Sequence, residues 1–119
     1  MNNNELKQLR TLLFLEVAEA AKYIGNCEPR TWQRWEKGDR AIPGDVQQTM
    51  QMLALTRLDM LQVQVQYSKT DPMYQYFADY DEFYNKTGAS LIKWRLAQSV
   101  AAALLCEREA EKWRVEETI

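Results

Sequence analysis

Apolar residues recur at helical spacing along most of the chain. After three asparagines, leucines at positions 6, 9 and 13 lie three or four residues apart, which predicts a first helix capped by Asn3 or Asn4. A second short helix is expected from about Val17 to Ile24, where alanines allow another helix to approach closely. Gly25 would end this helix, because glycine tolerates the left-handed C-cap conformation.

A third helix is predicted over residues 29–37, between Pro29, which suits a first helical position, and Gly38. Trp32 and Trp35 are three residues apart and share one face of it. The opposite face carries hydrogen-bond donors: Arg30, Gln33, Arg34 and Lys37. Such a helix suits a DNA major groove, where arginine can bond guanine and glutamine can bond adenine. An ordinary amphipathic surface helix is the alternative.

A long fourth helix is predicted from about Asp45 to Gln66. Its main apolar stripe contains residues 46, 50, 53, 58, 61 and 65, and residues 52, 55 and 60 give a second apolar side. A helix that is apolar on two sides packs against two partners. One partner is expected to be the core of the first three helices, and the other a C-terminal lobe or a second subunit.

The segment that follows contains the best strand candidate in the chain. Residues 73–77, MYQYF, are aromatic and alternate in polarity, which predicts one short strand. The sequence offers no second strand, so pairing with the same segment of another copy would satisfy its backbone. Asp79 and Glu82 then predict a capping box for a short helix that ends near Lys86.

A helix, a tight turn containing glycine and a second helix with outward donors make a helix-turn-helix arrangement. Residues 5–55 resemble the Cro/C1-type, or lambda-repressor-like, DNA-binding domain, and in particular its YdiL-like branch, which includes the anti-CRISPR-associated autorepressors. The residues that carry the resemblance are Glu19-Ala20-Ala21 with Ile24-Gly25, RTWQRWEKG at 30–38, Ile42-Pro43 and Asp45-Val46. A second block, WRLAQSVAA at 94–102, resembles the C-terminal region of that branch.

The resemblance implies a set of DNA contacts on and near the third helix. Bases would be read by Arg30, Thr31, Gln33 and Arg34, with Arg30 the foremost contact. Phosphate contacts, which set register rather than sequence, are expected at Thr31, Lys37 and Arg40.

The chain departs from the Cro/C1 pattern at two places. Cro/C1 domains usually begin their second helix with Ser or Thr followed by Gln, whereas Glu16 and Val17 stand at these positions here. The turn from Gly25 to Glu28 is also one residue longer than the common pattern, which would rotate the recognition helix slightly.

These patterns predict a mainly α chain in which an N-terminal lambda-repressor-like helix-turn-helix bundle is joined by a long helix to a small helical C-terminal lobe with one short strand. Residues 1–66 would be the DNA-binding domain, including the long helix, and residues 67–119 a dimerisation lobe. The last helix, from about Ser90 to Trp113, carries a broad apolar stripe, part of which must serve the lobe's own core. A lobe of about 50 residues is a marginal core, so a second copy would complete it. The expected dimer contacts are Tyr74, Tyr76, Trp94, Ala97, Ala101 and Leu104.

Charge limits how such a protein would bind. The net charge is −2, and residues 1–60 hold eight basic and eight acidic side chains. Residues 28–40 carry four basic and three acidic groups, of which Glu36 is expected to turn inward or toward the helix end. We therefore expect weak non-specific affinity for DNA and reliance on direct base contacts. An acidic partner protein, in place of DNA, is the alternative.

Catalytic chemistry has little support in the sequence. The chain has no histidine, which removes the commonest general base and metal ligand, and only four glycines, none in a phosphate-binding loop. The acidic residues Asp79, Asp81 and Glu82 fit a helix cap better than a catalytic or metal site. Two distant cysteines, Cys27 and Cys106, are expected to be reduced thiols in the cytoplasm, with a redox switch at Cys27 as the alternative. We expect no enzyme activity, no cofactor, no metal and no membrane binding.

The sequence thus predicts a homodimeric repressor that binds double-stranded DNA at an inverted repeat and occludes a promoter. Its two recognition helices would lie about 34 Å apart, one turn of DNA. The resemblance implies autoregulation of its own operon, with RNA as a second partner. The alternative is a protein-interaction module that keeps the helix-turn-helix as a scaffold and binds a partner through its C-terminal lobe.

Overall fold

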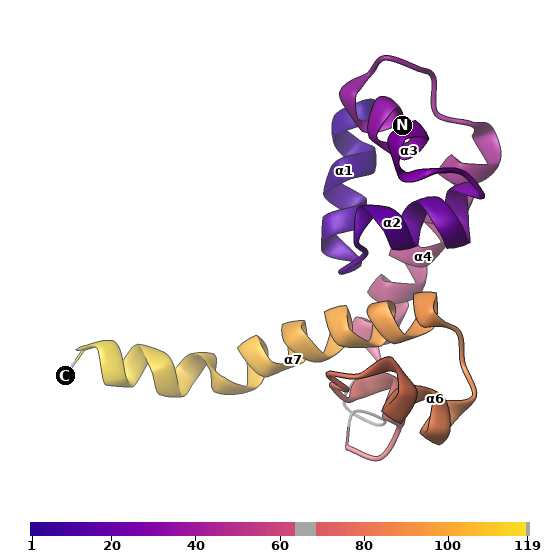
Figure 1. The fold of residues 1–119 in the computed structure, drawn as a ribbon. Coiled ribbons are helices and arrows are strands. Elements are labelled where there is room, and N and C mark those ends of the chain that lie inside the picture. Colours follow the sequence, from indigo (N-terminus) through magenta and orange to yellow (C-terminus); the bar gives the residue numbers. More distant parts are fainter. Residues whose placement is uncertain (64–68, 119) are drawn as a thin grey trace.

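The computed structural model describes residues 1–63 and 69–118, and these residues form helices and turns without a strand. Helices α1, α2 and α3 gather at one end of the molecule, and α4 runs from them toward α6 and α7 at the other end (Figure 1). The elements in chain order are α1 (Asn3–Leu12), α2 (Val17–Ala20), the π-helical turn η1 (Ala21–Gly25), α3 (Pro29–Lys37), α4 (Gly44–Gln62), the 3-10 turn η2 (Pro72–Tyr74), α6 (Tyr80–Thr87) and α7 (Leu91–Thr118). The mainly α fold class is therefore confirmed.

The cap of α1 lies one residue earlier than expected. The Asn2 side chain, rather than that of Asn3 or Asn4, accepts from the Glu5 N–H at 2.8 Å, and the Asn2 N–H donates to the Glu5 carboxylate at 2.8 Å. This reciprocal pair satisfies two N–H groups at the helix start. Asn3 instead links α1 to α3, because its Nδ2 donates to the Glu36 carbonyl at 3.2 Å.

The second helix is α-helical for one turn only and then widens into η1. The residue with the left-handed conformation at its end is Asn26, with φ of 49°, and not Gly25, so the predicted C-cap role of Gly25 is wrong. Asparagine adopts this region more readily than most residues. Gly25 is required for space, since a Cβ there would lie 2.9 Å from the Cys27 sulfur and 3.1 Å from the rings of Trp32 and Trp35.

The tryptophans of α3 are the centre of the N-terminal core, as predicted. Trp32 is fully buried and Trp35 is 6% exposed, with their ring centroids 5.5 Å apart. A buried large apolar side chain contributes about 1.5–3 kcal/mol relative to an exposed one, so the two rings fix α3 firmly. Leu96 of α7 also belongs to this core, and the other buried members are Leu6, Leu13, Leu15, Ala20, Ala21, Val46 and Met50.

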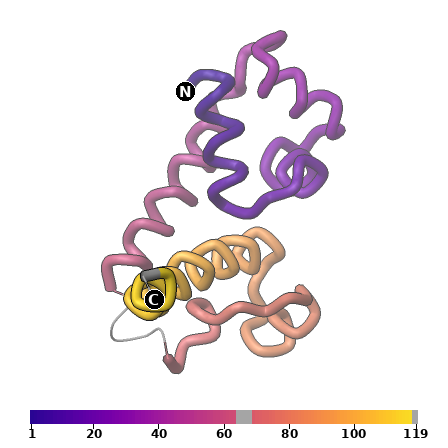
Figure 2. Tube along the Cα trace, turned by 90° about the vertical axis from the view of Figure 1, so that its left-hand side faces the viewer, coloured from indigo at the N-terminus to yellow at the C-terminus, as the bar shows by residue number. Residues whose placement is uncertain are grey.

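Helix α4 lies beside α1 and continues beyond it (Figure 2). Of its predicted main stripe, Leu58 is 52% exposed and therefore does not join the core. The second apolar side divides: Met60 packs against the core, whereas Met52 and Leu55 are 62% and 59% exposed. The helix ends at Gln62, and the expected extension through residues 64–66 lies outside the described residues, as does the boundary at 66/67.

The predicted strand at residues 73–77 is wrong. Pro72–Tyr74 forms a 3-10 turn, and the Asp71 side chain caps it by accepting from the Met73 N–H at 2.9 Å. Asp71 and Pro72 together favour a turn start, because proline fixes φ and aspartate satisfies an N–H group. The local turn thus satisfies backbone groups that an unpaired strand would leave open.

Helix α6 begins and ends as the sequence indicates, with one difference at its start. Asp79 is the N-cap, but its side chain accepts from the Asp81 N–H at 3.3 Å, and no reciprocal bond from Glu82 closes a capping box. Gly88 ends the helix with φ of 67°. Phe83 of α6 is fully buried against Trp94 and Ala97 of α7.

Helix α7 continues five residues past its expected end at Trp113. Its first half lies against the rest of the chain, and its second half extends away from it (Figure 1). No helix among the described residues is long and apolar enough to cross a membrane.

Candidate nucleic-acid interface

The outer face of α3 carries the residues that the sequence predicts to contact bases. Arg30 and Gln33 are exposed, and Arg34 is half-buried. These three positions and Lys37, which is also exposed, are three or four residues apart and therefore lie on one side of the helix. Their backbone is held rigidly, because the two tryptophans on the other side are buried.

The two remaining predicted residues lie at the edge of this face. Thr31 is half-buried at the side of α3, and its N–H donates to the Glu28 carbonyl at 3.0 Å. Arg40 is exposed in the loop after Gly38, which ends α3 with φ of 82°. The structure thus brings four of the six predicted residues onto one helix face and leaves Thr31 and Arg40 beside it.

Glu36 turns inward, as predicted, and forms a buried network. Its carboxylate accepts from Arg10 Nε at 2.6 Å and from Trp32 Nε1 at 2.5 Å. Arg10 also donates to Glu36 Oε1 at 3.1 Å and to the Leu15 carbonyl at 3.0 Å. The side chains of Glu36 and Arg10 are 9% and 15% exposed. Glu36 therefore adds no exposed negative charge beside the outer face, which carries Arg30, Arg34 and Lys37.

Lys7 of α1 is a basic residue that sequence analysis overlooked. It is exposed and lines a hollow of about 320 Å³ together with Val17, Gln33 and Lys37. The hollow lies where α1 and the start of α2 meet α3. No periodicity along the chain could have identified Lys7, because its place depends on how α1 packs against α3.

The turn between α2 and α3 is packed against the tryptophan core. The Cys27 N–H donates to the Ala21 carbonyl at 3.0 Å, and the Cys27 thiol is half-buried. Burial raises the pKa of this thiol, partly offset by a hydrogen bond from the Trp32 backbone. This turn therefore holds the start of α3 close to η1.

The expected dimer residues are mostly inside the chain. Tyr74, Trp94, Ala97 and Leu104 are 8%, 7%, 1% and 6% exposed, and they pack against residues of the same chain. Of the expected dimer residues, Tyr76 is 61% exposed and Ala101 is half-buried, so these two are accessible to a second copy. The apolar stripe of α7 indicates burial but does not say against which neighbour.

Tyr76 and Ala101 line a groove of about 460 Å³ on one side of α7. Leu105, which is 45% exposed, and Arg108 continue its wall. These two were not among the predicted dimer contacts.

The acidic residues of α6 lie at the start of that helix. Asp79 caps the helix, and Asp81 and Glu82 are exposed in its first turn. Across residues 1–63 and 69–118, no three side chains of the metal-binding types gather in a way that could hold an ion.

Comparison with known proteins agrees with the resemblance seen in the sequence. The model of the family described as Aca2/YdiL-like matches residues 1–112. The Aca2 repressor of Pectobacterium phage ZF40 is 39% identical over 115 residues, which cover 93% of this chain and 98% of that protein. The uncharacterised protein YdiL of Escherichia coli (strain K12) is 28% identical over 109 residues, covering 87% of this chain and 92% of that protein. Because the match spans nearly the whole chain, this protein belongs to the Aca2/YdiL-like family.

Proposed function

We propose that this protein is a homodimeric transcriptional repressor that binds an inverted repeat in double-stranded DNA. The observation that carries the proposal is the outer face of α3, where Arg30, Gln33 and Arg34 stand together opposite two buried tryptophans. The relative from phage ZF40 is itself named a repressor, which supports the same class of function. Promoter occlusion, including that of its own operon, would need no chemistry from the protein.

Each residue of the face has a distinct proposed role. Arg30 is exposed near the start of α3 and would bond guanine O6 and N7 together, while Gln33 would read adenine. Arg34 would reach a base edge or a neighbouring phosphate. Thr31, Lys37 and Arg40 would contact phosphates, and Lys7 would extend that contact from α1.

The second copy would bind along α7, with residues 67–119 serving as the dimerisation lobe. Leu105, which is 45% exposed, borders the groove that Tyr76 and Ala101 line, and farther along the extending half Trp113 and Val115 are 46% and 57% exposed. Exposed apolar side chains on a helix that leaves the body of its own chain are stabilised when they are covered, and a second copy supplies an equal set. The residues buried inside the chain would support this interface rather than touch the partner.

The test is a selection from random duplex DNA at physiological salt, followed by affinity measurement on the selected site. Arg30→Ala should weaken binding by about 1–3 kcal/mol, or roughly 5- to 150-fold, and relax selection at one position. Lys86→Ala, which removes an exposed cation from α6, is the matched control and should bind as the native protein does. Enrichment of no sequence by the folded native protein would refute the proposal. An RNA hairpin competing in the same assay tests RNA as a second partner.

One observation favours a second function, a protein-interaction module. Met52, Leu55 and Leu58 are 62%, 59% and 52% exposed on one side of α4. Exposed apolar patches on soluble proteins often bind other proteins. If this were the main function, binding of a partner would depend on this patch and would be indifferent to Arg30→Ala and to salt.

A further inference from the structure

A bidentate ion pair joins α2 to α7 across 76 positions of the chain. Arg95 Nε donates to Glu19 Oε1 at 2.9 Å, and Arg95 Nη2 donates to Glu19 Oε2 at 2.9 Å. The two side chains are 17% and 14% exposed, so the pair is largely shielded from water. A shielded pair with two parallel bonds has a defined geometry, unlike an exposed ion pair.

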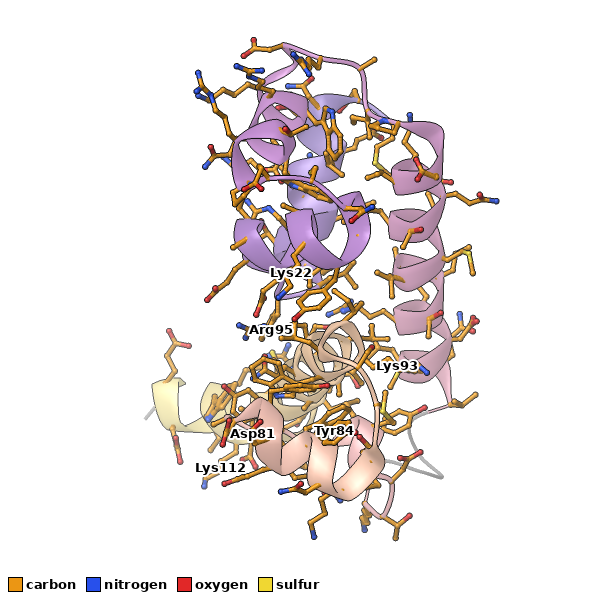
Figure 3. All side chains as sticks on the ribbon, turned by 45° about the vertical axis from the view of Figure 1, so that its right-hand side comes forward. Lys22, Asp81, Tyr84, Lys93, Arg95 and Lys112 are labelled. Atoms are coloured by element: carbon orange, nitrogen blue, oxygen red, sulfur yellow. The ribbon has the colours of Figure 1, made fainter. Side chains whose placement is uncertain are left out.

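Further contacts fix the orientation of Arg95. Its Nη1 donates to Gln98 Oε1 at 2.9 Å, and its guanidinium lies 4.2 Å from the centre of the Trp94 ring. Gln98 and Trp94 are held in turn, because both donate to the Phe77 carbonyl, at 3.0 and 2.7 Å. Figure 3 shows Arg95 between α7 and the helices of the N-terminal part, with Lys93 on another side of α7.

A movement of α2 would also move α3, the proposed recognition helix. α2 continues into η1, and Gly25 at its end lies directly against Trp32 and Trp35 of α3. A shift of α2 relative to α7 would therefore carry α3 with it. Other contacts between the N-terminal part and α7 include Leu96 and Ile92, which pack in the tryptophan core, and Arg57 of α4, which donates to the Ser99 hydroxyl at 3.2 Å. The Glu19–Arg95 pair adds a directional contact at α2, which would resist rotation of the N-terminal part about α4.

We propose that Glu19 and Arg95 are positioning residues that set the separation of the two DNA half-sites. The inference rests on the proposed function, in which α7 carries the dimer contact and α3 reads DNA. In such a dimer the Glu19–Arg95 pair connects α7, which holds the partner, to α2 and through it to α3, which reads DNA. Changing the separation by one base pair moves a half-site by about 3.4 Å and rotates it by about 34°. A dimer in which this connection is rigid should lose affinity when the half-site separation changes. A dimer in which the connection is loosened should bind the changed site nearly as well.

This role also accounts for the acidic start of α2. Glu16 stands where Cro/C1 domains usually have the Ser or Thr that begins the second helix, and Glu19 lies three residues later. The Glu16 N–H donates to Glu19 Oε1 at 3.0 Å, and the Glu16 carboxylate lies 3.6 Å from Arg95. The acidic groups at the start of α2 face a cation of α7, so this position would serve to orient α2.

The experiment measures affinity for a series of duplexes. The site selected by the native protein is rebuilt with its half-sites moved closer or farther by one and two base pairs, and an isolated half-site is included. The variants are Arg95→Gln and Glu19→Gln, which remove one charge each from opposite sides of the pair. The control Lys93→Gln removes one positive charge, as Arg95→Gln does, but at an exposed position of α7.

The native protein and Lys93→Gln should bind one separation best and lose affinity steeply at the others. In Arg95→Gln and Glu19→Gln the preference for that separation should fall by about tenfold, within the range seen for coupled neighbouring residues. Affinity for the isolated half-site should stay within about twofold of native, because α3 itself is unchanged. The variant with both Arg95→Gln and Glu19→Gln should lose no more of the separation preference than either single variant.

Three outcomes are distinguishable. An unchanged separation preference in both variants, with half-site binding intact, would overturn the inference while leaving the repressor function standing. A uniform loss of affinity at every separation and at the half-site would also overturn it, because that is the signature of general destabilisation. Failure of the native protein to select any duplex would refute the proposed function itself.

Discussion

The buried network around Glu36 gives a sharp test of how α3 is held. Replacing Glu36 with Ala removes the acceptor for Arg10 Nε at 2.6 Å and for Trp32 Nε1 at 2.5 Å. Arg10 keeps only its bond to the Leu15 carbonyl, and the indole N–H loses its partner. Glu36→Gln keeps the shape of the side chain and one acceptor oxygen but loses the charge.

The expected magnitude follows from burial and geometry. Breaking a buried ion pair costs about 3–5 kcal/mol, and hydrogen bonds to charged groups contribute about 1.5–3 kcal/mol each. Because the Arg10 side chain is 15% exposed, some water can reach the orphaned guanidinium, and the lower end of the range applies. We expect about 3 kcal/mol of destabilisation for Glu36→Ala and about 2 kcal/mol for Glu36→Gln, against a total stability of about 5–15 kcal/mol.

Urea unfolding followed by tryptophan fluorescence measures this directly, since Trp32 is part of the network. With a slope of about 1–3 kcal/mol per M, the Glu36→Gln midpoint should fall by about 1 M. Asp39→Asn makes the same charge change at an exposed position three residues away and should leave the midpoint within about 0.2 M of native. If Glu36→Gln shifts the midpoint no more than Asp39→Asn does, the network does not stabilise the fold as argued.

Two further predictions concern the turn between η1 and α3. Gly25→Ala should destabilise the protein by about 1–3 kcal/mol in the same urea assay, because the new Cβ would lie 2.9 Å from the Cys27 sulfur and 3.1 Å from Trp32 and Trp35; a native-like midpoint would show that the turn yields. Iodoacetamide at pH 8 should label the exposed Cys106 well before Cys27, whose pKa is raised above 9.0 by burial, and equal labelling rates would contradict this. The raised pKa also favours the neutral thiol in the folded state. The contribution of Cys27 to the free energy of unfolding is therefore complete below pH 9.0 and is lost as the pH rises through the pKa of the folded state.

Local chemistry explains which helices could be predicted from the sequence. Pro29 and Gly38 define α3 because proline fits the first helical position and glycine fits a left-handed end, and both effects act within one turn. The same chemistry was present at Asp71 and Pro72, yet the aromatic alternation after them outweighed it and led to a false strand. A capped turn satisfies its own backbone, whereas a strand needs a neighbour that the described chain does not supply.

Contacts between distant elements lie beyond what periodicity can show. The donor face of α3 followed from spacing alone, since residues three or four apart share one side of a helix. The stripe on α7 was also visible, but not that Trp94 and Ala97 would be buried by Phe83 of the same chain. Nor does any pattern pair Glu19 with Arg95, because a contact between residues 76 positions apart leaves no mark in local spacing.

The distance along the chain between Glu19 and Arg95 also has a consequence during protein synthesis. Ribosomes add about 5–20 residues per second, so the second partner of a pair 76 positions apart is made about 4–15 s after the first. Helices α1 to α4 precede Arg95 in the chain and contain most of the tryptophan core. A nascent or truncated chain that stops before Arg95 would therefore contain α3 without the ion pair that we propose orients it. The Glu19–Arg95 pair can form only after α7 has been translated.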